Sequence, residues 1–172
     1  MSKIIETTVY SFNELTEKSK YKAREWYRDG ALDYDWWENT YDDAERVGLK
    51  ITGFDLDRNR HATGEFIKCA ESCANAILKE HGKDCETFKD ATDYLKELAH
   101  LKEFHADKES TNGLTYEGDE QIEILESDFL KSILEDYSII LQKESEWIVS
   151  DEQADETILA NEYTFTVDGK RF

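Results

Sequence analysis

The chain has 172 residues, with 40 Asp and Glu against 21 Lys and Arg, a formal net charge of -19, and it contains no proline. So acidic a chain repels phosphate, and we expect no direct binding to nucleic acid. A membrane-spanning helix needs about 20 apolar residues, and no apolar run in the sequence approaches that length, so we expect that the chain is not a membrane protein. The opening residues lack the apolar region of a secretion signal, and three cysteines, an odd number, favour free thiols in a reducing cytoplasm.

Turn and capping residues divide the first half of the chain into elements. β-branched and aromatic residues predict a strand at the start. Thr16 can cap a helix that Gly30 ends, and Gly53 predicts a bulge in a second strand. The elements predicted here are a strand at 4–12, helices at 16–29 and 33–47, a strand at 49–56 and a helix at 63–81.

Helical periodicity dominates the second half. Leu130, Leu134 and their neighbours recur at helical spacing and predict a long helix. Ser150 and Gln153 match the S-x-x-Q capping box of a shorter helix. A polar stretch with two glycines predicts a loop. The elements predicted here are a helix at 86–104, the loop at 105–118, helices at 124–147 and about 150–161, and a strand at 163–167.

This order of elements predicts a helix-rich α+β fold. We expect a small three-stranded, mainly antiparallel sheet with helices packed on one face, because the strands do not alternate regularly with the helices. The length favours a single domain over 1–172. Within it we distinguish an aromatic-rich N-terminal platform (1–104), the loop (105–118), and a strongly acidic helical part with the final strand (119–172).

Negative charge is concentrated in the second half. Residues 117–162 hold 15 acidic side chains against only two basic ones, a net charge of -13. Asp119, Glu123 and Glu126 follow i, i+4, i+7 and would line one helix face, where like charges cost a few tenths of a kcal/mol per pair. A sequence selected only for stability would place lysines between them. The spacing therefore indicates that the negative electrostatic field of these carboxylates has a function.

A row of carboxylates can occupy a groove of Lys and Arg that normally holds nucleic acid. We therefore predict a partner-binding acidic surface. The alternative is a solvated acidic face that only maintains solubility. The carboxylates predicted to bind a partner are those of Glu117, Asp119, Glu120, Glu123, Glu126, Asp128, Glu135, Asp136, Glu144, Glu146, Asp151, Glu152, Asp155 and Glu156.

Two adjacent tryptophans form the second candidate site. Trp36 and Trp37 must point to different sides of a helix, so we expect one in the core and the other as a partly exposed anchor for a partner. The alternative is that both only pack one helix against another.

Two sets of residues resemble metal sites. Asp55-x-Asp57-x-Asn59 has the opening spacing of a calcium loop, but Arg60 stands where that loop needs Gly and Phe66 where it needs Glu. The alternative is a polar turn in which arginines pair with the aspartates. A zinc set is the second possibility, although core packing explains its first two members as well: Cys69, Cys73, His81 and Cys85.

The sequence has no motif of a known enzyme chemistry. G-x-S-x-G, G-x-x-x-x-G-K-[ST], G-x-G-x-x-G and H-E-x-x-H are all absent from it. We therefore predict no catalytic, cofactor-binding or metal-binding residues and a protein that is not an enzyme.

Three stretches, VYSFNELTEKSKYKAREWYRDG, WWENTYDDAERVGLKITGFDLDR and ETILANEYTFTVDGKRF, resemble a family of small acidic proteins encoded by phages and prophages, some of them described as antitoxin-like. The resemblance implies the cytoplasm of a bacterial host and the setting of phage–host conflict. There, small acidic proteins inhibit host defence as DNA mimics or as anti-CRISPR proteins. The implied partner is a host defence protein with a basic nucleic-acid-binding surface, and the alternative is an antitoxin-like module that binds through the region of the two tryptophans.

Overall fold

The structure is a computed structural model that describes residues 6–109 and 116–172, with side chains described for 6–105 and 118–172. The described chain forms two compact units. Unit 1 comprises Met1–Trp36 and Lys143–Phe172, and unit 2 comprises Trp37–Gln142. The single domain over 1–172 stays a prediction.

The helix-rich α+β class is confirmed, but the single three-stranded sheet is wrong. The described residues form two separate two-stranded antiparallel sheets, β1 with β4 and β2 with β3. The strand predicted at 49–56 pairs with the segment that follows it in the chain, so it needs no partner from the two ends.

Unit 1 is built from the two ends of the chain. Tyr10 pairs with Phe165 and Ser11 with Thr164, which brings β1 and β4 together in a strand pair much shorter than the predicted strands at 4–12 and 163–167. Residues 4 and 5 of the first predicted strand lie outside the described residues. The elements are β1 (Tyr10–Ser11), η1 (Phe12–Glu14), α1 (Glu17–Arg28), α6 (Asp151–Ala160) and β4 (Thr164–Phe165).

Side-chain caps fix the starts of both α-helices in unit 1. The Ser19 backbone N–H donates to Thr16 Oγ1 at 3.3 Å, and the Gln153 backbone N–H donates to Ser150 Oγ at 3.1 Å. Both predicted N-caps are therefore confirmed. The Gln153 side chain does not complete the capping box, because the Ser150 backbone N–H donates instead to the Trp147 carbonyl at 3.0 Å. The Gln153 amide group donates to Thr157 Oγ1 at 3.2 Å. A small apolar core joins the elements, made of Phe12, Leu15, Ala23, Ile158 and Phe165.

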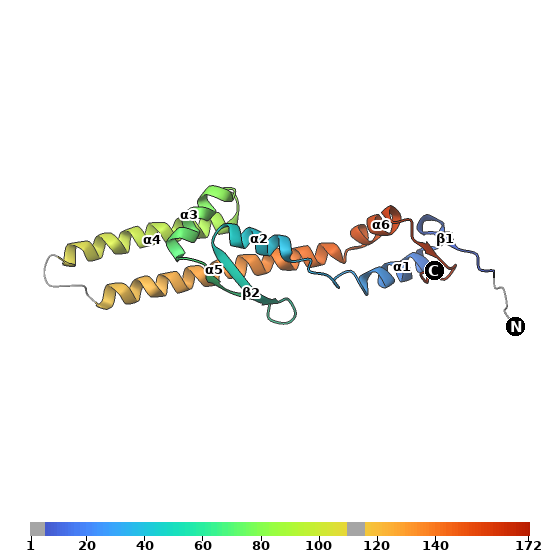
Figure 1. Cartoon of the computed structure of the whole chain (residues 1–172), viewed down its shortest axis with the longest axis horizontal. Helices are drawn as coiled ribbons and strands as arrows, with labels where there is room; N and C mark the ends of the chain where they lie inside the picture. The colour runs from blue at the N-terminus through green and yellow to red at the C-terminus, as the bar shows by residue number, and fades with distance from the viewer. Residues whose placement is uncertain (1–5, 110–115) are drawn as a thin grey trace. The chain divides into compact units, whose positions relative to one another are not determined.

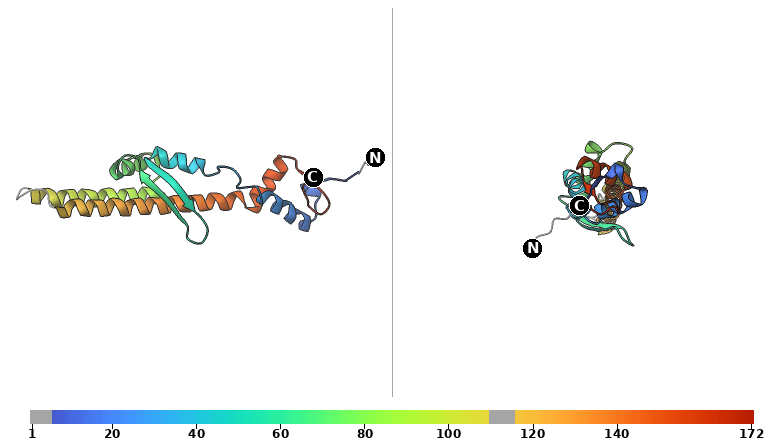
Figure 2. Two further views of the ribbon diagram at one scale, coloured as in Figure 1. Left: turned by 60° about the horizontal axis from the view of Figure 1, so that its bottom comes forward. Right: turned by 90° about the vertical axis from the view of Figure 1, so that its right-hand side faces the viewer.

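Unit 2 packs a β-hairpin and short helices against two long helices. Figure 1 and Figure 2 show α4 lying beside the part of α5 that belongs to this unit. The β2–β3 register shifts between Ile51 and Gly53, which confirms the predicted irregularity at that glycine. The elements are α2 (Glu38–Arg46), β2 (Leu49–Asp55), β3 (His61–Phe66), α3 (Ala70–Glu80), α4 (Glu86–Glu109) and α5 (Tyr116–Ile148).

The helix predicted at 63–81 is wrong in its first turns, which form β3 instead. Along His61–Phe66 exposed and half-buried residues alternate, as expected for a strand. Gly64 permits the close approach to β2, because a Cβ there would lie 2.5 Å from the Lys50 carbonyl and 3.0 Å from Leu134 Cδ2. The helical spacing of Phe66, Cys73 and Ile77 misled the prediction, since only the last two belong to α3.

The polar turn between β2 and β3 is held by α5. Arg60 Nε donates to Ser138 Oγ at 3.0 Å, Arg60 Nη1 to Gln142 Oε1 at 2.7 Å, and Arg60 Nη2 to Glu135. The predicted pairing of the turn's arginines with its aspartates is therefore wrong for Arg60. Asp55 instead accepts the Asp57 backbone N–H at 2.8 Å within the turn.

Helix boundaries differ from the predictions mainly around the polar loop. α4 runs to Glu109 and α5 begins at Tyr116, so the loop predicted at 105–118 is wrong at both ends, and residues 110–115 lie outside the described residues. α2 begins at Glu38 rather than near residue 33. Both long helices extend beyond their apolar stripes, because polar residues without proline continue a helix at small cost.

Gly169 supplies a test of unit 1. Its φ is +83°, and a Cβ there would collide with the Ser19 carbonyl. We expect Gly169→Ala to lower the free energy of unfolding by about 2 kcal/mol or more. The alanine would hold a positive φ that disfavours it, and the backbone would also have to move to relieve the collision. The matched control is Gly30→Ala, where a Cβ meets only Asp33 Oδ2 at 3.7 Å, and we expect a change within about 0.5 kcal/mol. Urea unfolding of both variants measures this, and equal losses would contradict it.

Candidate partner-binding surface

An aromatic stack joins α4 to α5 in unit 2. Tyr94 stacks on Phe129 with ring centroids 4.4 Å apart and an interplanar angle of 14°. Phe66 of β3 also stacks with Phe129, with ring centroids 5.8 Å apart. Tyr94 and Phe129 are 3% and 4% exposed. Burial raises the pKa of the Tyr94 hydroxyl. The stack is the floor of a groove between the two helices.

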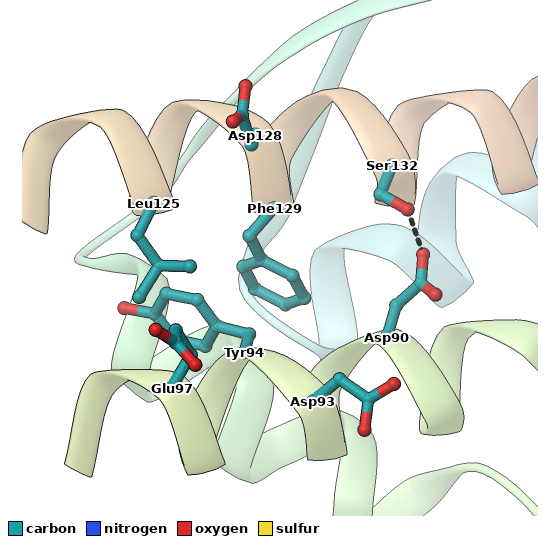
Figure 3. Close-up of a pocket in the computed structure, with 8 residues that line it drawn as sticks. All are labelled: Asp90, Asp93, Tyr94, Glu97, Leu125, Asp128, Phe129 and Ser132. Atoms are coloured by element: carbon teal, nitrogen blue, oxygen red, sulfur yellow. Dashed lines mark hydrogen bonds between the residues drawn. The ribbon is translucent and has the colours of Figure 1, made fainter. Parts of the chain in front are cut away.

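Carboxylates of α4 border this groove. Asp90, Asp93 and Glu97 line it from α4, and Leu125, Phe129 and Ser132 point into it from α5 (Figure 3). Ser132 Oγ donates to Asp90. Asp128 is also among the lining residues, and its carboxylate is drawn on the side of α5 away from α4 (Figure 3). Three carboxylates around the groove favour basic side chains, which gain ion pairs there.

The basic residues of the two helices neutralise little of this surface. Lys96 Nζ lies 3.3 Å from Asp93, and Lys131 Nζ lies 3.0 Å from Asp128, both exposed i, i+3 pairs. Such pairs contribute about 0–1 kcal/mol each, so a partner's basic groups can replace them. Glu97 has no ion pair within the part of the chain that the structure describes.

The first predicted carboxylates of α5 lie on the same helix, before the residues that line the groove. Asp119, Glu120 and Glu123 are exposed and Glu126 is half-buried. Among the described residues none of the four forms an ion pair. Glu117 lies in α5, but its side chain lies outside the described ones. These carboxylates, with Asp128 and those of α4, are called the α4–α5 acidic face from here on: Asp90, Asp93, Glu97, Asp119, Glu120, Glu123, Glu126 and Asp128.

Two further predicted residues of α5 have internal roles. The Glu135 carboxylate forms an ion pair with Arg60 of the β2–β3 turn. Asp136 is half-buried, and its Oδ2 has no hydrogen-bond partner among the described residues. Burial, with Asp90 and Glu86 nearby, raises the pKa of Asp136 to about 6. Partner binding by these two stays a prediction, and the contact with Arg60 already explains the presence of Glu135.

The remaining predicted carboxylates belong to unit 1, so the predicted surface is divided between the units. Arg24 donates two hydrogen bonds of 2.6 Å to the Asp155 carboxylate. Arg28 donates hydrogen bonds to Asp151 and to the Val149 carbonyl. Arg24 is thereby fixed against α6. The other predicted residues in this unit are Glu144, which is half-buried, and Glu146, Glu152 and Glu156, which are exposed.

The two tryptophans of the second candidate site differ in exposure. Trp36 is 7% exposed, and Trp37 is half-buried, with its ring 5.6 Å from that of Phe54 in an edge-to-face contact. One therefore lies in the core, as expected. A partner contact by Trp37 stays a prediction. The part of its ring that packs against Phe54 is not available to a partner.

The sequence prediction missed the α4 side of the groove. Asp90, Tyr94 and Glu97 fall at i, i+4, i+7, which places them along one stripe of a helix. Lysines are interspersed along this helix and reduce its net charge, so the charge alone did not indicate an acidic surface. The stripe of alternating acid and aromatic residues was the signal that could have found it.

No group of three or more His, Cys, Asp or Glu within 6–109 and 116–172 is placed to hold a metal ion. In the same residues, no helix combines the length and apolar character that crossing a membrane requires. Cys69 and Cys85 are exposed free cysteines, whereas Cys73 is buried.

Comparison with known proteins gave no relative from which a role could be transferred. No protein-family model matches the chain, and no curated protein and no solved structure matches it significantly. The candidate site therefore rests on the geometry of the chain alone.

Asp136 makes the stability of unit 2 depend on pH. Because its folded pKa is about 6 and an unfolded Asp titrates near about 3.9, the folded state binds the proton more tightly between these values. Its contribution is therefore least favourable at neutral pH and improves as the pH falls toward about 4. We expect Asp136→Asn to raise the free energy of unfolding by about 1 kcal/mol near neutral pH and to lose this advantage near about pH 4.

Urea unfolding across that pH range checks the prediction. Asp128→Asn is the control, because Asp128 is exposed and pairs with Lys131. A gain for Asp136→Asn that does not change with pH would contradict the assigned role.

Substitutions of Asp155 and Glu156 distinguish a carboxylate with an internal role in unit 1 from one that is exposed to solvent. Asp155→Asn leaves Arg24 without its bidentate partner, and we expect a loss of about 1–3 kcal/mol in the free energy of unfolding. The neighbouring Glu156 is exposed, so Glu156→Gln should change it by less than about 0.5 kcal/mol. Chemical denaturation compares the two, and similar values would show that Asp155 is not an internal anchor.

Proposed function

We propose that this protein is a non-enzymatic inhibitor that occupies a basic, nucleic-acid-binding surface of another protein. The observation that supports this best is the α4–α5 acidic face. Asp90, Asp93 and Glu97 border an aromatic-floored groove, and Asp119 and Glu123 continue the charge along α5 without ion pairs among the described residues. Carboxylates left without internal partners are available to a partner's Lys and Arg.

The biological setting follows from the resemblance to small acidic phage and prophage proteins. The proposed partner is a host defence protein in the bacterial cytoplasm, and the proposed mode is that of an anti-CRISPR or anti-restriction inhibitor. A surface of carboxylates takes the place of phosphates, which the basic groove of such a partner would otherwise bind. The division of the predicted carboxylates between units narrows the proposal to α4 and α5.

Two matched charge reversals test the proposal. Glu97→Lys/Glu123→Lys alters the α4–α5 acidic face, and Glu152→Lys/Glu156→Lys makes the same charge change on exposed residues of α6. The partner is captured from host lysate with the unaltered protein and identified. Its affinity for each variant and its DNA binding in their presence are then measured.

We expect the first double variant to bind at least about tenfold more weakly and to lose inhibition, with the second nearly unchanged. Binding of the unaltered protein should fall steeply between about 50 and 200 mM salt, and competing duplex DNA should displace it. Binding that ignores both salt and DNA would contradict the proposal. A greater loss from Trp37→Ala than from Glu97→Lys/Glu123→Lys would favour the antitoxin-like alternative instead.

A further inference from the structure

Unit 1 contains a cavity of about 420 Å³ at the C-terminal end of α1. Its wall combines three aromatic rings, those of Trp26, Tyr27 and Tyr163, with the carboxylate-bearing Asp29. Trp26 and Tyr163 meet edge to face, with centroids 5.2 Å apart. Trp26 is 36% exposed, so one of the rings is accessible from outside. The remaining lining residues are Gly30, Ala31 and Thr157.

Two of these rings already hold a guanidinium group. Arg171 Cζ lies 4.7 Å from the ring centroid of Tyr163 and 5.6 Å from that of Trp26. Arg171 Nη1 also donates to the Thr164 carbonyl at 3.2 Å. The contact shows that the electron-rich faces of this aromatic pair attract a planar cation, as expected for Trp and Tyr.

The Asp29 carboxylate brings negative charge to the lining of the cavity. Asp29 caps the C-terminal end of α1, where the helix dipole already favours a cation. Asp29 is exposed and has no ion pair among the described residues. The adjacent Arg28 cannot supply one, because its guanidinium is bonded to Glu25, Asp151 and the Val149 carbonyl.

We propose that this cavity binds the guanidinium group of an arginine side chain on a partner protein. The ring surface that Arg171 does not cover would contact the flat cation, and Asp29 would accept its N–H groups as a bidentate pair. A lysine ammonium would gain the charge attraction but not the stacking. The site lies in unit 1 and uses none of the α4–α5 acidic face, so it can hold or fail independently of the proposed inhibition.

Titration with the tripeptide Ac-Gly-Arg-Gly-NH₂ tests this site. The probe is added to the full ¹⁵N-labelled chain, and the indole N–H signals of its four tryptophans are followed by NMR. The Trp26 signal is assigned with Trp26→Phe. We expect it to shift saturably, with a Kd of about 1–10 mM. Ac-Gly-citrulline-Gly-NH₂ has the same shape without the charge, and we expect it to bind at least about fivefold more weakly.

Asp29→Asn keeps the cavity and removes its charge, so binding of the arginine peptide should weaken about fivefold. Asp35→Asn, an exposed carboxylate outside the cavity lining, is the control and should leave it unchanged. Equal binding of the citrulline and arginine peptides would overturn the proposal. An equal effect of the two Asp→Asn variants, or the absence of a saturable Trp26 shift, would also overturn it.

Discussion

The stack of Tyr94 on Phe129 is the contact on which the charged surface of unit 2 depends. It joins two helices that both carry a net negative charge and would otherwise repel each other. Phe66 of β3 extends the stack, so the hairpin and both helices share one apolar centre. Because this burial supplies the stability, the carboxylates around it need no internal partners.

Arginines divide the acidic residues into internal and displayed groups. Arg60 fixes Glu135 beside the hairpin turn, while Arg24 and Arg28 fix Asp155 and Asp151 on α6. The charge of the described α4–α5 acidic face is opposed only by exposed lysine pairs, which are weak and replaceable. A net charge that looks continuous along the sequence therefore has two distinct roles in the structure.

Local signals in the sequence were sufficient for much of the fold. Thr16 and Ser150 begin their helices as predicted, and the β2 irregularity falls at Gly53, because caps and bulges depend on near neighbours in the chain. The start of β3 was missed because Phe66 lies at helical spacing from α3. Its strand state depends on Gly64 fitting against Lys50 and Leu134, a long-range contact that no local pattern reveals.

The candidate site was predicted only in part for the same reason. The α5 side followed from charge and spacing, whereas the α4 side is masked in sequence by interspersed lysines. The internal role of Asp151 and Asp155 could not be predicted, since their arginine partners lie more than 120 residues earlier. Spacing locates charge on a helix face, but only the tertiary fold decides which charges are neutralised.

The most direct test of this account is a map of where a simple polycation binds. Deca-lysine is titrated into the ¹⁵N-labelled chain at low salt, and backbone amide shifts are followed residue by residue. We predict early, saturable shifts around Glu97, Asp119 and Glu123, and little change at Asp151 and Asp155. Shifts that begin at Asp151 and Asp155, or that spread evenly over all acidic residues, would contradict it.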